Sequence, residues 1–252
     1  MALEVRDVRV VLGGAEIIGK IRLQLRKGEL VALLGPNGSG KSTLMKSIYG
    51  ILRPTGGVVY IDGRELPSLE RRDIAKHLGY LPQESESAGL SVLDVVLFGR
   101  LPYSHFSPGR DDYERAVRAL KLVGMEEYAR RNFSELSGGE KQKVLLARIF
   151  CQETEYLLLD EPTSHLDIKS QVEIMEIVRK LVDSGKGALV AMHDVNLAAM
   201  FSDRVVMLKD GKVVVDGKTQ EVLTPENIEA VYGIGVEVVR HNGSIVVVPK
   251  LK

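Results

Sequence analysis

The sequence has few of the features that mark several large classes of protein. Cys151 is its single cysteine among 252 residues, which excludes an internal disulfide and favours a reducing compartment. This cysteine lies in the apolar run KVLLARIFCQ, where a small buried residue is expected. The chain contains no run of 18 apolar residues, and its first residues, MALEVRDV, lack the pattern of a signal peptide. We therefore expect a soluble protein that could act at a membrane only through a partner.

The chain also has no excess of either charge. Its 34 Lys and Arg residues equal its 34 Asp and Glu residues, and no polybasic tail is present. Neither nucleic acid nor lipid is indicated as a partner, because both attract an excess of positive charge. The apolar content of 44% is enough for a sizeable core, and the length suits one domain with an insertion.

Strand-like and helical segments alternate along most of the chain, which predicts an α/β fold with a mostly parallel sheet. Residues 91–134 depart from this alternation, since they have helical spacing with no strand between, and we interpret them as a helical insertion. The expected strand runs are 3–12, 21–35, 58–63, 78–83, 155–160 and 187–194, with hairpins at 204–217, turning at Asp210-Gly211, and around Asn242-Gly243. The expected helices are 41–52, 168–183, 196–202 and 225–232.

The stretch GPNGSGKST matches the pattern G-x-x-x-x-G-K-[ST] and stands between an apolar strand and a helix. Glycines there let successive backbone N–H groups point at phosphate oxygens, and the helix start adds its positive dipole end. Lys41 would reach the β and γ phosphates, and the Ser42 hydroxyl would bind magnesium. An ordinary glycine-rich turn is the alternative. The expected nucleotide-binding residues are Gly35, Pro36, Asn37, Gly38, Ser39, Gly40, Lys41, Ser42 and Thr43.

Two acidic residues follow the apolar run LLL in the stretch LLLDEP. Asp160 ends the expected strand, where a carboxylate can hold magnesium directly or through water. Glu161 comes next and should point to the other side, where it could polarise a water for in-line attack on the γ phosphate. A helix N-cap or a turn would explain the same two acids if the phosphate-binding loop were absent.

A second glycine pair occurs in LSGGE, about a hundred residues after the first loop. Ser137 and Glu140 form the S-x-x-E pattern of a capping box before an apolar helical run. Capping does not explain Gly138 and Gly139, which are poor residues for a first helical turn. Their bare backbone would let the helix N-terminus approach an anion closely.

The motifs resemble, in their order, those of an ATP-binding cassette (ABC) ATPase. They are GPNGSGKST, LSGGE, LLLDEP, SHLD and the single residue His193. The resemblance extends over residues 3–249. It implies a P-loop NTPase core with flanking helices, an N-terminal antiparallel β subdomain and an inserted α-helical subdomain. It also implies ATP hydrolysis with Mg²⁺ and a head-to-tail dimer, in which the second glycine pair serves the nucleotide of the other copy.

The same resemblance assigns roles to single residues. Gln83 resembles the glutamine that contacts magnesium and the attacking water, Asp167 the acid that crosses the dimer interface, and His193 the histidine that touches the γ phosphate. Taken alone, each of these residues would have a purely structural explanation: Gln83 and His193 as polar residues at strand ends, and Asp167 as a helix cap. The expected magnesium ligands are Ser42, Gln83 and Asp160, and the expected residues acting across the dimer are Ser137, Gly138, Gly139, Glu140 and Asp167.

Two positions depart from the family pattern. Leu12 stands near the place where most relatives stack an aromatic ring on adenine, so we expect weaker stacking and lower base selectivity. Glu140 stands where glutamine is commoner, and because it can still complete the capping box we expect little functional loss.

The GRLPY element of residues 99–103 and the stretch VLTPENIEAVYGIGVEVV resemble cassettes of iron–siderophore, haem and cobalamin importers. This implies two copies beneath two membrane permease subunits, on the cytoplasmic face, with an external binding protein that delivers the cargo. A coupling helix would dock near Gln83 and residues 95–106, with Tyr103 and Phe106 either as anchors or as core residues. We expect one nucleotide-binding domain over residues 1–252, with the insertion at about 84–140 and a C-terminal helix and hairpin at about 219–250.

Three other functions use the same ATP chemistry. An exporter cassette has the same motifs. A soluble cassette of DNA repair or translation usually has a long coiled coil or two tandem cassettes, and this chain has neither. A cassette that only scaffolds cofactor assembly would not need the GRLPY element.

Overall fold

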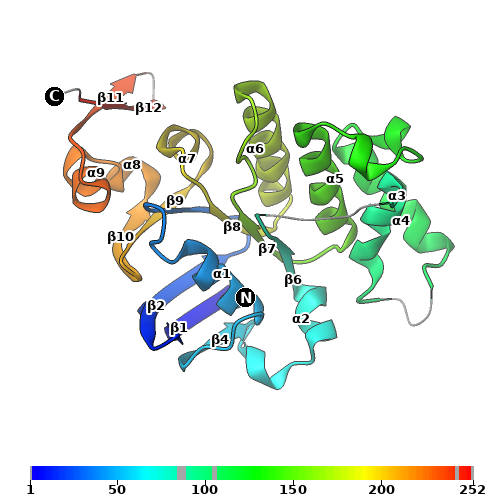
Figure 1. The fold of residues 1–252 in the computed structure, drawn as a ribbon, viewed down its shortest axis with the longest axis horizontal. Coiled ribbons are helices and arrows are strands. Elements are labelled where there is room, and N and C mark those ends of the chain that lie inside the picture. The colour runs from blue at the N-terminus through cyan, green and yellow to red at the C-terminus, as the bar shows by residue number, and fades with distance from the viewer. Residues whose placement is uncertain (1, 84–88, 104–106, 242–243, 251–252) are drawn as a thin grey trace.

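The computed structural model describes residues 2–83, 89–103, 107–241 and 244–250, and these form three β-sheets covered by helices (Figure 1). The Asn242-Gly243 turn, Phe106 and the beginning of the expected insertion at 84–88 lie outside the described residues. None of the described helices combines the length and the hydrophobicity that crossing a bilayer requires.

The central sheet has the strand order β10-β9-β3-β8-β7-β6. All its neighbouring strands are parallel except β9 and β10, which form the expected antiparallel hairpin at the edge. Every residue of β3, β7 and β8 is buried, as expected of strands covered on both faces. The strands are β3 Leu30–Leu34, β6 Leu78–Leu81, β7 Tyr156–Asp160, β8 Gly187–Ala191, β9 Arg204–Lys209 and β10 Lys212–Lys218.

A second, antiparallel sheet is formed mainly by the N-terminal residues, in the order β2-β1-β4-β5. The expected single run at 21–35 proves to be two strands in two sheets. Gly28 adopts a φ of 76° in the turn between them, a backbone conformation that glycine accepts without steric cost. The strands are β1 Ala2–Leu12, β2 Ala15–Arg26, β4 Gly56–Ile61 and β5 Arg64–Glu65.

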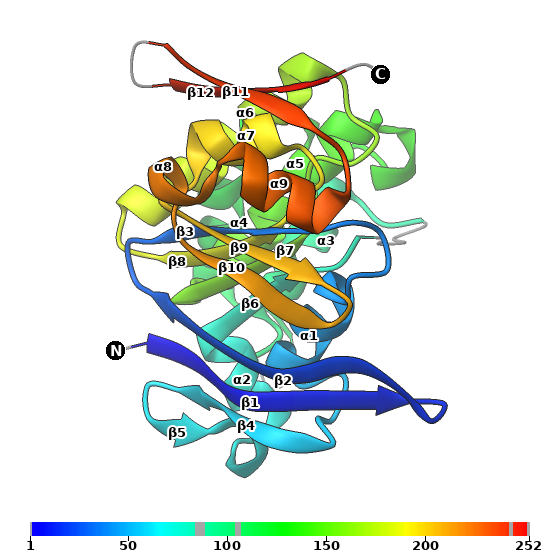
Figure 2. The ribbon, with the colours of Figure 1, turned by 90° about the vertical axis from the view of Figure 1, so that its left-hand side faces the viewer.

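Helices cover both faces of the central sheet, with α1 on one side and α5 to α7 on the other (Figures 1 and 2). The expected helices at 168–183 and 225–232 have the same bounds in the structure, whereas α2 was not predicted because Ile74 is its single large apolar residue. The α-helices are α1 Lys41–Tyr49, α2 Arg71–His77, α3 Val92–Leu97, α4 Arg110–Leu122, α5 Gly138–Cys151, α6 Ile168–Asp183, α7 Val195–Phe201, α8 Thr219–Val222 and α9 Pro225–Tyr232. Short 3₁₀ helices are η1 Leu66–Ser68, η2 Phe98–Arg100, η3 Glu126–Tyr128 and η4 Phe133–Glu135. The C-terminal hairpin is β11 Val236–His241 and β12 Ser244–Pro249.

The core is divided by the central sheet. Alternate residues of β3 face opposite ways: Ala32 and Leu34 pack in one apolar cluster with residues of α3 to α7, and Val31 and Leu33 pack in another with α1 and the N-terminal sheet. Helices α3 and α4 pack on α5, and the described residues between 89 and 135 contain no strand. The α/β fold with an antiparallel N-terminal subdomain and a helical insertion is therefore confirmed. Both cores meet β3 and β7, whose carboxyl ends hold the residues described next.

Candidate functional site

The phosphate-binding loop runs from the end of β3 to the start of α1, as expected. A Cβ atom at Gly35 would lie 2.3 Å from the backbone oxygen of Leu208, and one at Gly40 would lie 2.5 Å from the Ile18 side chain. Both residues also have positive φ, 151° and 100°. Glycine at these two positions is therefore required by the approach of neighbouring chain and by backbone conformation.

Lys41 is buried at the first position of α1. Its Nζ donates to the carbonyl oxygens of Gly35 at 2.8 Å and Pro36 at 3.2 Å. Burial lowers the pKa of the Lys41 ammonium, while Glu161 and Asp160 oppose that shift. The cation is thus held inside the loop by neutral groups, from which it can turn towards an anion without breaking an ion pair.

Asp160 ends β7 with 1% of its surface exposed. The Ser42 hydroxyl donates to its Oδ1 at 3.0 Å, and the Tyr80 hydroxyl lies 3.5 Å from its Oδ2. Burial raises the pKa of the Asp160 carboxyl, since a buried charge loses hydration. A carboxylate and a hydroxyl offer the oxygen ligands that Mg²⁺ prefers, and a cation would offset the cost of burying the charge. These residues therefore fit magnesium, although the described residues contain no cluster of three His, Cys, Asp or Glu side chains able to hold a metal.

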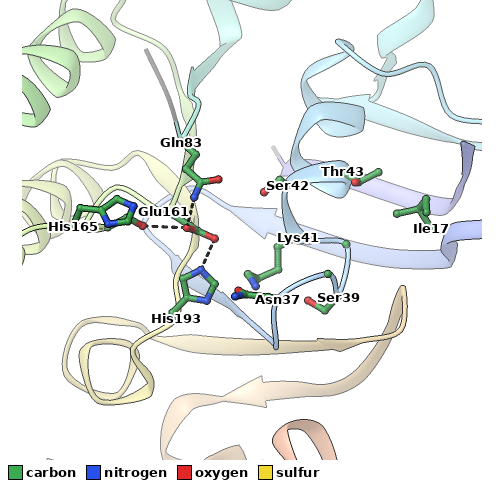
Figure 3. A pocket seen from close by; sticks show the side chains of 13 residues that line it. Ile17, Asn37, Ser39, Lys41, Ser42, Thr43, Gln83, Glu161, His165 and His193 are labelled. Carbon is green, nitrogen blue, oxygen red and sulfur yellow. Dashed lines mark hydrogen bonds and ion pairs between the residues drawn. The ribbon is translucent and has the colours of Figure 1, made fainter. Parts of the chain in front are cut away.

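Glu161 follows directly but points elsewhere, because its φ of 53° turns the chain sharply. Its carboxylate accepts hydrogen bonds from the Gln83 amide at 2.8 Å and the Ser164 hydroxyl at 3.1 Å, and it lies 2.5 Å from the His193 Nε2 atom. Figure 3 shows Gln83 and His193 approaching the Glu161 carboxylate from separate segments. Gln83, Glu161 and His193 are thus brought together, as the motifs predicted, at the ends of β6, β7 and β8.

A cleft of about 790 Å³ separates this carboxylate from the phosphate-binding loop. Its lining includes Ile17, Ser164 and His165, to which the sequence analysis assigned no role. Figure 3 shows Ile17 and His165 on opposite sides of the cleft. Ser164 and His165 belong to the SHLD motif, which ends in the expected Asp167, so the motif itself was the available signal. The described lining is Ile17, Asn37, Gly38, Ser39, Gly40, Lys41, Ser42, Thr43, Gln83, Glu161, Ser164, His165 and His193. Leu12, Gly35 and Pro36 are not part of it.

The second glycine pair lies at the N-terminus of α5 and is outside the lining of this cleft. Ser137 caps the helix: its amide donates to the Glu140 carboxylate at 2.8 Å, and the Glu140 amide approaches the Ser137 hydroxyl at 3.4 Å. The predicted capping box is therefore present. We call Ser137–Glu140 the signature corner.

Asp167 lies beside the signature corner. It caps α6 by accepting a hydrogen bond from the Ser170 amide at 3.0 Å. A Cβ atom at Gly139 would lie 3.0 Å from the Ser170 hydroxyl, and one at Gly138 would lie 3.6 Å from the Leu166 side chain. The residues expected to act across a dimer thus form one surface group, separate from the cleft of their own chain.

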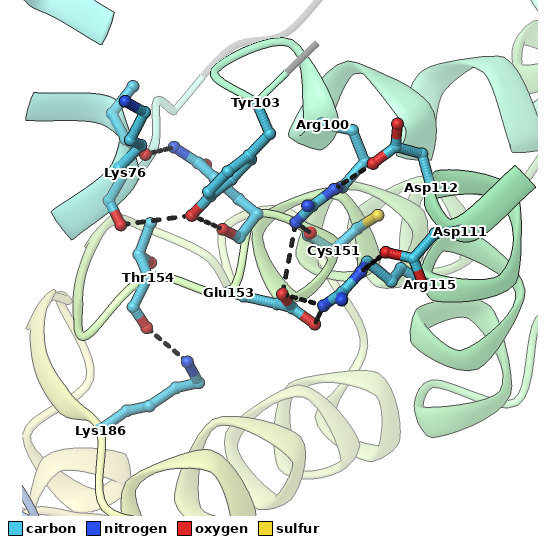
Figure 4. Close-up of polar contacts among 12 residues, drawn as sticks. Lys76, Arg100, Tyr103, Asp111, Asp112, Arg115, Cys151, Glu153, Thr154 and Lys186 are labelled. Atoms are coloured by element: carbon cyan, nitrogen blue, oxygen red, sulfur yellow. Dashed lines mark hydrogen bonds and ion pairs between the residues drawn. The ribbon is translucent and has the colours of Figure 1, made fainter. Parts of the chain in front are cut away.

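The GRLPY element fastens the helical insertion to the core (Figure 4). A Cβ atom at Gly99 would lie 2.2 Å from the Arg148 carbonyl oxygen, so this element packs directly on the α5 backbone. Arg100 is buried and donates to Asp112 at 2.8 Å and to the Cys151 carbonyl at 2.9 Å. The Tyr103 ring stacks on the Arg100 guanidinium, and its hydroxyl donates to the Gln152 carbonyl at 2.9 Å. Tyr103, one of the two residues expected either as anchors or as core residues, therefore contacts its own chain. Cys151 is buried, as expected.

The sequence of this chain is similar to those of many known proteins. A sequence model of the family described as "ABC transporter" matches residues 18–164. An uncharacterized ABC transporter ATP-binding protein of Methanocaldococcus jannaschii is 43% identical, over 99% of this chain and 98% of its own length. The hemin import ATP-binding protein HmuV of Myxococcus xanthus is 40% identical, over 97% and 94%. The iron(3+)-hydroxamate import ATP-binding protein FhuC of Bacillus subtilis is 38% identical, over 94% and 90%.

Solved structures give a similar result. A metal-chelate type ABC transporter in an inward-facing conformation aligns with a TM-score of 0.87 and 29% identity, covering 99% of this chain and 97% of that one. A dimeric ATP-binding cassette, MJ0796, in a post-hydrolysis state with ADP and Pi, aligns with a TM-score of 0.76 and 31% identity, covering 86% and 98%.

Proposed function

Because the chain belongs to the ABC transporter family, as its motifs predicted, we propose that it is the ATP-hydrolysing subunit of a metal-chelate importer. The cargo class would be an iron–siderophore, haem or cobalamin. The GRLPY element and the hemin and iron-hydroxamate importers among its relatives support this choice. The structural observation that carries the ATPase assignment is the Glu161 carboxylate, held by three side chains across a cleft from a phosphate-binding loop.

ATP would bind with its phosphates in the loop of residues 35–43. The backbone amides and the α1 N-terminus favour anions there, and Lys41 would exchange its two carbonyl partners for phosphate oxygens. Mg²⁺ would be held by Ser42, Asp160 and Gln83. When bound, this ion neutralises negative charge on the phosphates. The adenine contact proposed for Leu12 would lie beside the cleft, where Ile17 contributes an apolar surface.

Glu161 would hold the attacking water as a hydrogen-bond acceptor. Gln83 and Ser164 fix one carboxylate oxygen, and His193 lies against the other, so the group is oriented before substrate arrives. Such orientation is the main protein contribution to phosphoryl transfer, which requires little covalent chemistry from side chains. His193 would also contact the γ phosphate from its place in the cleft lining.

Two copies would pack head to tail to complete each site. The signature corner presents the bare amides of a helix N-terminus at the surface, away from its own cleft, and Asp167 lies beside it. Both features suit contact with a nucleotide held by the other copy. Closure of the dimer on ATP and its opening after product release would do the mechanical work.

The remaining assignments concern assembly. Two permease subunits would receive force through a coupling helix near Gln83 and residues 95–106, and an external binding protein would deliver cargo. The subunit would be peripheral, on the cytoplasmic face of the membrane. The whole chain would act as one nucleotide-binding domain, with its insertion at about 84–140 and its C-terminal helix and hairpin at about 219–250.

Uptake by the assembled transporter tests this proposal. The chain is co-expressed with permease subunits that co-purify with it, and vesicles holding the complex are supplied with binding protein and radiolabelled ferric siderophore, haem or cobalamin. We expect ATP-dependent accumulation of one of these chelates with the wild type and none with Glu161→Gln, whose amide cannot accept the water proton. ATP-dependent movement of solute outwards, or the failure of any permease subunit to co-purify with the chain, would overturn the importer assignment.

A further inference from the structure

The C-terminal helix reaches the nucleotide site from the opposite end of the sequence. Helix α9 ends at Tyr232, and Gly233 closes it with a φ of 72°. The amide of Gly35, the first residue of the phosphate-binding loop, donates to the Tyr232 hydroxyl oxygen at 3.0 Å. These residues are 197 positions apart, so the contact depends on the way that α9 lies over the β9–β10 edge (Figure 2).

Gly35 connects this tyrosine to Lys41. Its amide donates to Tyr232, and its carbonyl accepts from the Lys41 ammonium at 2.8 Å. The Gly35 backbone packs closely on β9, since a Cβ atom added to this glycine would lie 2.3 Å from the Leu208 oxygen. Hydrogen bonds on both sides and this close packing therefore set the orientation of the Gly35 backbone.

A second connection fixes α9 to the same loop. The Lys209 ammonium donates to the Ala230 carbonyl in the last turn of α9 at 2.6 Å. Lys209 ends β9, and in the turn that follows the Gly211 amide donates to the Ser39 carbonyl at 3.1 Å. The C-terminal helix thus supports the phosphate-binding loop at Gly35 and, through the turn, at Ser39.

We propose that Tyr232 is a positioning residue for nucleotide binding, which holds the Gly35 peptide so that the loop and Lys41 are arranged for phosphate before ATP arrives. This inference rests on the proposed function. Tyr232 touches no phosphate in this role and acts through Gly35. Preorganisation of a binding loop increases affinity because less ordering is required when the ligand binds.

The test replaces the hydroxyl alone. In full-length Tyr232→Phe, the Gly35 amide loses its acceptor while the ring keeps its packing. We expect the Kd of a fluorescent ADP analogue to rise about three- to tenfold, the factor that corresponds to one hydrogen bond. The Kd of the matching ATP analogue should rise by the same factor, because the loop start does not distinguish a third phosphate. KM for ATP should rise similarly, with kcat within about twofold of wild type.

Tyr113→Phe is the matched control, since this tyrosine is 46% exposed on α4 in the helical insertion. It should bind as wild type, and all titrations are made below the melting temperature of each variant. The inference is overturned if Tyr232→Phe binds as wild type, if only ATP binding weakens, or if Tyr113→Phe weakens binding equally. Wild-type protein that binds no nucleotide would instead overturn the proposed function.

Discussion

The phosphate-binding loop and the signature corner are both glycine-containing helix starts, yet they are built differently. The loop is enclosed: Lys41 is buried, Gly35 touches β9, and Ile18 packs over Gly40. The signature corner is open, and its serine is satisfied by Glu140 from its own helix. The loop places a buried cation near an acid whose surroundings fit magnesium, whereas the signature corner offers backbone amides alone.

In the proposed head-to-tail dimer, these two regions would form the two halves of one nucleotide site. Groups that must hold a charged ligand in one chain are buried together, because burial strengthens electrostatic interactions. Groups that would meet the nucleotide of the other copy have to remain accessible, and at the signature corner they are capped within their own helix. The proposed division can be tested by pairing a chain whose loop is intact with a chain whose signature corner is intact.

The largest expected effect comes from mixing two inactive chains. Lys41→Ala removes the loop cation, and Ser137→Arg blocks the corner, so each variant alone should show only background ATPase activity. A heterodimer of the two, purified with two different tags, retains one intact loop opposite one intact corner. We expect it to recover measurable ATP turnover, up to about half that of the wild-type dimer, because the partner supplies what each chain lacks.

The matched control places both substitutions on one chain and pairs it with wild type. That heterodimer contains the same altered residues but no intact site, and it should stay at background. Equal activity in the two heterodimers, or complete wild-type activity in either variant alone, contradicts a site shared between chains.

The next effect separates binding from turnover. Glu161→Gln keeps the size of a side chain held by Gln83 and Ser164 but removes its charge. We expect ATP turnover to fall by about 10²- to 10⁴-fold, the usual contribution of a general base. ATP binding should persist, and size-exclusion chromatography with light scattering should show a stable ATP-dependent dimer. Glu176→Gln, at an exposed position of α6, is the control and should leave turnover unchanged. Normal turnover in Glu161→Gln would contradict the proposal that Glu161 holds the attacking water.

Much of this site could be predicted because its residues stand at element ends with strong local signals. Asp160 ends a buried strand, Glu161 and His193 each come shortly after one, and the carboxyl ends of parallel strands meet at one edge. The capping box at Ser137 is likewise a local pattern. Periodicity also located the helical insertion and the two helices whose bounds agree with the structure.

The remainder depends on contacts between distant segments. The bond from Gly35 to Tyr232 joins residues 197 positions apart, and no local pattern indicates it. Ile17 lines the cleft from β2, which belongs to a different sheet from β3, a division that the continuous strand-like run of residues 21–35 concealed. Tyr103 contacts its own chain because Arg100 is buried beside Asp112, which lies in the next helix.

The same substitution in both glycine regions should have opposite effects on stability. Gly35→Ala places a methyl group 2.3 Å from the Leu208 oxygen at positive φ, so we expect the free energy of unfolding to fall by about 2 kcal/mol. Gly138→Ala meets only an ordinary 3.6 Å contact and should gain a few tenths of a kcal/mol from helix propensity. Urea unfolding measures both changes.

Activity should not follow stability at the signature corner. Because a methyl group would hold its amides away from the partner's nucleotide, Gly138→Ala should lose about tenfold or more in ATP turnover, since displacement of about 1 Å can cost up to 10²-fold. Full activity in a stabilised Gly138→Ala protein would show that the glycine pair does not approach an anion.

The smallest effect is expected at Glu140. The Ser137 hydroxyl and amide hold the pKa of the Glu140 carboxyl below its usual value of 4.5. Its ionised form therefore stabilises the fold above about that pH, and this contribution is lost as the pH falls through the lowered pKa. Glu140→Gln keeps the capping geometry without the charge, and because the site is exposed we expect it to cost only about 0.3 kcal/mol at pH 7. Melting temperatures of the two proteins should converge as the pH falls from 5 to 3, while ATP turnover at pH 7 stays within about twofold; a large loss of turnover would show that the charge itself acts on the partner's nucleotide.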